Sequence, residues 1–136
     1  MGVKINFITD GDVSGVISVA HNNKLNNDIY IGVGGAPEGV LAAAALKCLN
    51  CQMQTRLVFQ DKNEKERTIK LGIKDLNKKY NIEDMVKDDV IFCATGVTNG
   101  DLVKGIKDLG NSFQSETFVL HKSSKINKII KNQLNK

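Results

Sequence analysis

The chain has 136 residues, of which 41% are apolar, 25% are charged and 3 are cysteines. This length predicts a single domain with its own core, and the composition excludes a disordered or collagen-like chain. The sequence shows no apolar run long enough for a membrane helix and no export signal, so we expect a cytoplasmic protein with no membrane partner.

The net charge of +4 arises at the end of the chain. Residues 121–136 hold five lysines and no acidic residue, whereas the remainder has 14 basic against 15 acidic residues. The basic character therefore belongs to a tail and not to a broad binding face. Because the few aromatic residues are also widely spread, we expect no nucleic acid partner.

Apolar periodicity and turn residues predict strands that alternate with helices. In chain order these are a strand at 3–9, a short helix or looser connection at 13–21, a strand at 28–33, a helix at 36–49, a strand at 53–59, an amphipathic helix at 62–80, and strands at 89–95 and 115–121. This alternation predicts an α/β fold with a mixed, mainly parallel sheet layered with helices. The continuous apolar runs at 29–33 and 90–94 are typical of strands that are buried on both faces.

The lysine-rich tail carries a periodic apolar pattern of its own. Ile126, Ile129, Ile130 and Leu134 stand at helical spacing, so periodicity alone predicts a helix at the end of the chain.

Three loops follow expected strands and share one kind of chemistry, at residues 9–12, 32–39 and 95–101. If the three strands run parallel, their loops lie along one edge of the sheet, where ligands bind in open α/β folds. Glycines there admit a ligand close to the backbone, and a helix N-terminus suits phosphate. Asp10, Asp12 and Glu38 offer carboxylates for sugar hydroxyls or for a hard cation such as Mg²⁺ or Mn²⁺. Each loop, taken alone, also fits an ordinary turn or helix start.

Two further patterns suggest other functions. A strand, the glycine loop at 32–39, a helix, a strand and then Asp61 imitate a nucleotide-binding unit, which keeps open a non-catalytic phosphosugar- or nucleotide-binding module. Cys48 and Cys51 have the spacing of a redox pair or a zinc half-site. They follow the end of an expected helix, where the dipole disfavours a thiolate, so we expect ordinary thiols.

Three ordered segments, DGDV at 10–13, GGAPEGV at 34–40 and ATGVTNGDL at 94–102, resemble the class II fructose-1,6-bisphosphatase family. The SET run at 115–117 and the strand after it resemble the C-terminal segment of that family. The likeness covers nearly the whole chain. It implies the C-terminal half of a fold similar to the inositol monophosphatases and related sugar phosphatases.

The resemblance also implies an activity and its residues. Members hydrolyse the 1-phosphate of fructose 1,6-bisphosphate to fructose 6-phosphate in gluconeogenesis, with Mn²⁺ or Mg²⁺, and some also accept sedoheptulose 1,7-bisphosphate. By similarity, Glu38 is a catalytic metal ligand. Asp10 and Asp12 hold sugar hydroxyls, and Gly34 and Gly35 leave room beside the substrate.

The resemblance corrects the expected architecture at two points. Family members carry an N-terminal half with an Asp-Pro-Ile-Glu-Gly-Thr metal motif, and no such motif occurs in this sequence. We therefore expect residues 1–136 to be one domain, the C-terminal domain of a two-domain enzyme. We expect that enzyme to be a homo-oligomer, and this chain alone to be inactive. The end of the family's chain resembles a β-hairpin, which competes with the helix that periodicity predicts for the tail.

Overall fold

The structure is a computed structural model that describes residues 2–9, 11–21 and 27–136. Its elements, in chain order, are α1 (Asp12–Ala20), α2 (Ala36–Cys48), β1 (Gln54–Arg56), α3 (Lys62–Lys70), β2 (Lys79–Asn81), α4 (Ile82–Met85), β3 (Ile91–Thr95), β4 (Lys107–Asp108), β5 (Ser112–His121) and β6 (Ile126–Asn135). Among the described residues, no helix is both long and apolar enough to span a bilayer.

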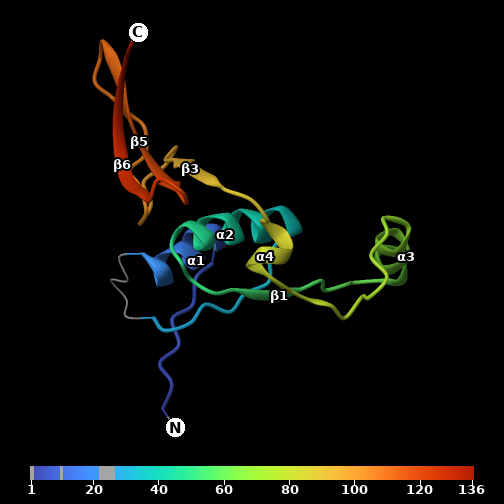
Figure 1. Ribbon diagram of the computed structural model, residues 1–136. Helices are drawn as coiled ribbons and strands as arrows, with labels where there is room; N and C mark the ends of the chain where they lie inside the picture. Colours follow the sequence, from blue (N-terminus) through green and yellow to red (C-terminus); the bar gives the residue numbers. More distant parts are fainter. Residues whose placement is uncertain (1, 10, 22–26) are drawn as a thin grey trace.

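The strands form two antiparallel sheets (Figure 1). β1 pairs with β2, and β5 is the centre of the larger sheet, with β6 along one edge and β3 and β4 along the other. The α/β class is therefore confirmed, but the prediction of a mainly parallel sheet is wrong. The alternation of strands and helices suggested parallel crossovers, whereas β5 and β6 are joined by a tight hairpin turn.

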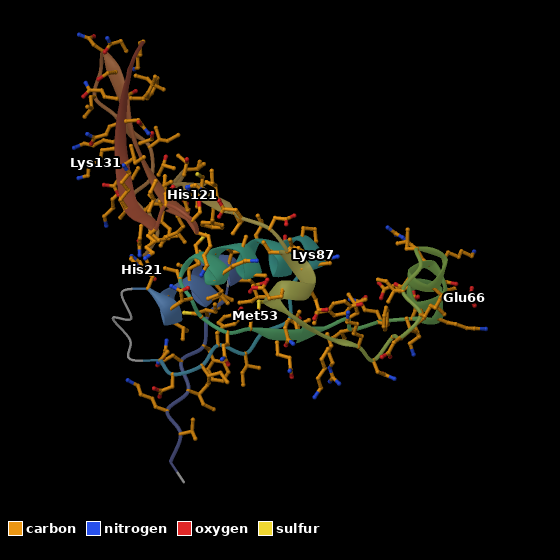
Figure 2. All side chains as sticks on the ribbon, viewed as in Figure 1. His21, Met53, Glu66, Lys87, His121 and Lys131 are labelled. Carbon is orange, nitrogen blue, oxygen red and sulfur yellow. The ribbon has the colours of Figure 1, made fainter. Side chains whose placement is uncertain are left out.

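The core lies between the two N-terminal helices and one face of the larger sheet. Ile17 of α1, Ala45 of α2 and Phe118 of β5 are each fully buried in one cluster. The small Ala side chains of α2 allow close packing on both of its sides, because Ala43 belongs to a second cluster with Ile82 of α4. His21, at the end of α1, lies against the sheet (Figure 2), with its ring 4.9 Å from that of Phe118.

The tail forms β6, so the hairpin that the family resemblance implies is confirmed and the helix is wrong. Ile126, Ile130 and Leu134 pair with every fourth residue of β5, namely His121, Thr117 and Phe113, and share one face of the sheet. A spacing of four residues is close to one helical turn, but it is also two full periods of a strand, so this pattern fits both structures. The β-branched isoleucines of this segment and its pairing with β5 favour the strand over the helix.

The helix expected over residues 62–80 stops at Lys70. Gly72 has φ +93°, and its N–H donates to the carbonyl of Ile69 at 2.9 Å. The N–H of Ile73 donates to the carbonyl of Thr68 at 3.3 Å, which completes a Schellman termination. α3 has no buried residue and stands apart from the other helices, as the position of Glu66 in Figure 2 makes plain.

The first two expected strands are not strands in this structure. Residues 3–8 and 28–33 form neither helix nor strand, and neither segment pairs with a strand among the described residues. The expectation of burial on both faces is also wrong, since the side chains of Ile31 and Ile91 are 85% and 61% exposed. These apolar segments have the composition of strands but lack a neighbour in the described part of the chain.

A polar cluster closes the β5–β6 turn against the segment that precedes β3. The Asp89 carboxylate accepts hydrogen bonds from the N–H groups of Val90 and Ser123, each at 3.0 Å, and lies 2.9 Å from Nε2 of His121. Ser123 Oγ lies 3.1 Å from the same Nε2. A hydrolytic triad places its acid and its serine on opposite nitrogens of the histidine ring. Here Asp89 and Ser123 both lie at Nε2, so this cluster stabilises the structure and does not activate a nucleophile.

The stability that this cluster adds to the fold should depend on pH through Asp89. The Ser123 hydroxyl, the His121 ring and the N–H groups of Val90 and Ser123 lower the pKa of Asp89 from 3.8 to about 2. A carboxyl with a lower pKa in the folded state adds stability above pH 3.8, and this contribution disappears as the pH falls towards about 2.

We expect Asp89→Asn to lower the urea unfolding midpoint at neutral pH, and we expect the difference from the parent chain to vanish near pH 2. Asp88→Asn is the matched control, because the exposed Asp88 side chain makes no hydrogen bond or ion pair with any described residue. A difference that is constant with pH, or that is equal for Asp88→Asn, would contradict this role of the Asp89 charge.

Candidate active site

Two carboxylates stand at the beginnings of the two N-terminal helices. α1 begins at Asp12, and α2 begins after Gly35, with Pro37 and Glu38 in its first turn. Proline is well placed there because the first helical N–H groups have no partner within the helix. α1 packs against α2, and the Asp12 side chain at the start of α1 lies beside Gly34, just before the start of α2.

Both carboxylates fold over the glycine turn that precedes α2. A Cβ atom at Gly34 would lie 2.6 Å from Oδ2 of Asp12, and a Cβ atom at Gly35 would overlap the carboxylate of Glu38. A side chain at either glycine would require the end of the Asp12 or Glu38 side chain to move from this arrangement. Four of the residues that the sequence predicted for the site, Asp12, Gly34, Gly35 and Glu38, are thus brought together. Asp10, the fifth, lies outside the described residues.

Tyr30 is a residue of this site that the sequence analysis missed. Its hydroxyl donates to Oδ1 of Asp12 at 3.1 Å. Burial, together with the hydrogen bond to Asp12 and the charge of that residue, raises the pKa of Tyr30 above its ordinary value of 10.0. The phenol therefore keeps its proton and fixes one oxygen of Asp12. Tyr30 stands in an apolar run, so the sequence suggested a core residue. The one signal for a site role was its hydroxyl group, which needs a hydrogen-bond partner when it is buried.

The site contains part of the ligand set that a divalent cation requires. Carboxylate oxygens are the ligands that Mg²⁺ and Mn²⁺ prefer, so Glu38 and Asp12 have suitable chemistry. Across the described ranges, however, no group of three or more His, Cys, Asp or Glu side chains could hold a metal ion.

Comparison with known proteins assigns this sequence to a family. The family model described as bacterial fructose-1,6-bisphosphatase, glpX-encoded, matches residues 1–134. The chain belongs to this family. The match includes every residue of the glycine turn and both helix starts, so the glpX-encoded bisphosphatase family is the frame for interpreting them.

Curated members of the family are similar to this chain over part of their length. Fructose-1,6-bisphosphatase class 2 of Haemophilus influenzae is 41% identical over 144 residues, which cover 95% of this chain and 43% of that protein. D-fructose 1,6-bisphosphatase class 2/sedoheptulose 1,7-bisphosphatase of Synechococcus sp. strain JA-2-3B'a(2-13) is 35% identical over 137 residues, which cover 91% of this chain and 39% of that protein. The chain therefore spans about two fifths of the length of these bisphosphatases.

The third predicted loop, at residues 95–101, folds on itself. The N–H of Ile106 donates to the carbonyl of Val97 at 3.1 Å, and the N–H of Gly105 donates to Oδ1 of Asn99 at 3.0 Å. Glu116 of β5 accepts from the N–H of Lys104 at 2.9 Å. The premise of three parallel strands with their loops on one edge is wrong. No hydrogen bond within the described ranges joins this loop to the glycine turn.

Asp61, which gave the glycine loop its likeness to a nucleotide site, has a structural role in this chain. Its Oδ1 accepts from the N–H of Glu64 at 2.8 Å and caps α3. Such a cap satisfies one of the free N–H groups at the helix start. The carboxylate is thus engaged by its own helix, and the nucleotide-binding alternative loses the acid on which it depended.

Cys48 and Cys51 follow the expected placement at the end of α2. Cys48 Sγ donates to the carbonyl of Val90 at 3.5 Å, and Cys51 Sγ donates to the carbonyl of Leu49 at 3.6 Å. Burial raises the pKa of the Cys48 thiol above 9.0, which lowers the fraction of reactive thiolate at neutral pH. The geometry supports two ordinary thiols.

Proposed function

We propose that this chain supplies the substrate-side half of the active site of a class II fructose-1,6-bisphosphatase. The reaction hydrolyses the 1-phosphate of fructose 1,6-bisphosphate. The bond between phosphorus and the C1 oxygen breaks, phosphorus takes the oxygen of water, and fructose 6-phosphate and inorganic phosphate leave. The observation that carries the proposal is the convergence of Asp12 and Glu38 over the glycine turn at 34–35, in a chain of this family.

In this proposal each residue has a separate task. Asp12, with one oxygen fixed by Tyr30, accepts hydrogen bonds from sugar hydroxyls together with Asp10. Gly34 and Gly35 leave space for the substrate beside the backbone. Glu38 holds a Mn²⁺ or Mg²⁺ ion near the scissile phosphate, and that ion would withdraw charge from the phosphoryl oxygens when bound.

The proposal extends to the protein as a whole. Residues 1–136 form the C-terminal domain of a two-domain enzyme, and an N-terminal half brings the remaining metal ligands. The enzyme serves gluconeogenesis in the cytoplasm as a homo-oligomer. Sedoheptulose 1,7-bisphosphate is a second substrate, a proposal supported by the name of the Synechococcus relative.

A chimeric enzyme tests this function. This chain is joined to the Haemophilus bisphosphatase in place of the stretch that it matches, and phosphate release from fructose 1,6-bisphosphate is measured with Mn²⁺. We expect the chimera to hydrolyse the substrate and the 136-residue chain alone to show no activity above background. Robust hydrolysis by the chain alone, or none by a folded chimera, would contradict the proposal.

Tyr30→Phe tests the positioning of Asp12 in the chimera. The loss of one hydrogen bond, worth about 0.5–1.5 kcal/mol, should raise KM about 2- to 10-fold and leave kcat nearly unchanged. Tyr80→Phe is the matched control, since the Tyr80 hydroxyl has no hydrogen bond partner within the described ranges. A fall in kcat with KM unchanged would remove Tyr30 from this role.

A further inference from the structure

β6 is an edge strand of the larger sheet. It runs for ten residues, and within the described chain it pairs with β5 alone (Figure 1). An edge strand carries a row of backbone N–H and C=O groups on its free side, and a strand of another molecule can pair with that row. The free side of β6 is therefore a surface to which a further strand can be added.

Alternate residues of β6 direct their backbone groups to this free side. The N–H of Lys136, just beyond the strand, donates to the carbonyl of Asn111 at 3.0 Å, beside the last pair of the β5–β6 ladder. Backbone groups of an antiparallel strand point in turn to one side and then to the other. The even-numbered residues therefore face β5, and the odd-numbered residues present their N–H and C=O groups to the free side: Asn127, Ile129, Lys131, Gln133 and Asn135.

The side chains of β6 alternate between the two faces of the sheet. Ile129 pairs with Phe118, which is buried against α1 and α2, so the odd-numbered side chains lie on this inner face. The even-numbered side chains lie on the opposite, outer face: Ile126, Lys128, Ile130, Asn132 and Leu134. A strand that pairs with β6 must match both faces, because side chains of directly opposite residues contact each other.

β6 is complementary to itself in one antiparallel register. When a two-fold axis passes through Ile130, this residue lies opposite its own copy, and the pair falls between two sets of backbone hydrogen bonds. The other opposite pairs are Ile126–Leu134, Asn127–Gln133, Lys128–Asn132 and Ile129–Lys131. On the outer face apolar side chains thus meet apolar side chains, and in no pair does one lysine lie opposite another.

The neighbouring registers are less favourable. A shift of one residue would place the outer face of one copy on the inner side of the other. A shift of two residues in one direction would place Lys131 opposite its own copy, where like charges repel each other. The same shift in the other direction would place Leu134 opposite Ser124, which lies in the β5–β6 turn. The sequence of β6 therefore favours the register centred on Ile130.

The lysines of β6 are compatible with this register. Lysine on an edge strand commonly opposes the addition of another strand. Lys131 Nζ, however, lies 3.5 Å from Oε1 of Glu116, so an acid of its own chain balances its charge. Lys128 would lie opposite Asn132, whose amide oxygen can accept a hydrogen bond. Charge repulsion therefore excludes a competing register and leaves this one in place.

We propose that β6 is the interface between two copies of this chain, which pair antiparallel about Ile130 and join their larger sheets into one. Such a contact uses the same surface on both copies, so it closes as a dimer. The proposal deepens the proposed function, on which it rests for the homo-oligomer, by naming the surface that joins the subunits.

A cysteine cross-link tests the register. Cys93→Ser first removes the exposed native thiol from the 136-residue chain. In this background Ile130→Cys should form a covalent dimer under mild oxidation, because opposite residues between the hydrogen bonds have Cα atoms about 4.5 Å apart. Asn132→Cys is the matched control, since its two copies would lie about 13 Å apart along the strands. No dimer from Ile130→Cys, or an equal yield from Asn132→Cys, would overturn the proposal.

A charge substitution tests the interface at equilibrium. Asn132→Lys would place two lysines opposite each other on both sides of the axis, and it should raise the dissociation constant of the dimer about tenfold or more, measured by sedimentation. Asn63→Lys is the control, because it adds the same charge at an exposed position on α3. A parent chain that is monomeric at high micromolar concentration, or equal dissociation constants for the two variants, would refute the β6 interface.

The interface and the proposed function have separate readouts. Sedimentation of the chain measures association, and phosphate release by the chimera measures chemistry. An inactive chimera beside an intact β6 dimer would refute the proposed function alone. An active chimera beside a monomeric chain would refute the interface alone.

Discussion

Glu38→Gln in the chimera is expected to lower kcat about 1,000-fold or more, because the amide cannot hold the divalent ion whose charge stabilises the reacting phosphate. If Glu38 only complemented the dipole of α2, the same change would cost about 0.3–1 kcal/mol of stability and leave catalysis intact. The measurement is phosphate release as a function of Mn²⁺ concentration, beside a thermal melt of the same protein.

Glu66→Gln is the matched control for Glu38. Glu66 lies on α3, where its carboxylate is 3.6 Å from Lys62 Nζ on the surface, and its replacement should change neither the melt nor the rate. A Glu38→Gln chimera that hydrolyses fructose 1,6-bisphosphate at the parent rate, with the parent metal requirement, would remove Glu38 from the metal site.

Phe118→Ala is expected to destabilise the chain by about 3–5 kcal/mol, since a buried phenyl ring leaves a cavity that the surrounding core fills only in part. Phe118 is fully buried between the sheet and the N-terminal helices. The whole free energy of unfolding of a domain is about 5–15 kcal/mol, so much of the stability should disappear. The urea midpoint, followed by far-ultraviolet circular dichroism, measures the loss.

Phe113→Ala is the control on the same strand. Phe113 is 41% exposed, and its ring lies 4.6 Å from Lys136 Nζ, so its removal should cost about 0.5–1 kcal/mol. Equal midpoint shifts for the two phenylalanines would show that the face of β5 next to α1 and α2 is not the core of the domain.

The elements that the sequence predicted well are those with strong local signals. Pro37, in the first turn, marked the start of the helix predicted at 36–49, and α2 ends within one residue of the expected end. β3 and β5 were found from β-branched and aromatic residues bounded by polar turns. Strand direction has no such local signal, because pairing depends on residues far apart in the sequence. The parallel sheet was predicted from the order of the elements alone, and that prediction is wrong.

The strands predicted at 3–9 and 28–33 are wrong for a different reason. Their composition is that of strands, but a strand needs a neighbour, and none lies among the described residues. The site was anticipated through the glycine run and the acids beside it, which are adjacent in sequence to the turn they cover. Tyr30 was not anticipated, because its contact with Asp12 joins residues 18 positions apart and arises only from the folded arrangement of the chain.

The β5–β6 hairpin has a consequence for the order in which the domain folds. Its strands are neighbours in sequence, so closing its turn costs little chain entropy and can occur within microseconds. Ile17 meets Phe118 only after a much longer loop closes, and contacts of that kind form late. We therefore expect the β5–β6 hairpin to form before α1 packs against it. The residues of the proposed site, Asp12 and Glu38, belong to the two helices that pack on this sheet, so we expect the site to take its final shape after the hairpin has formed.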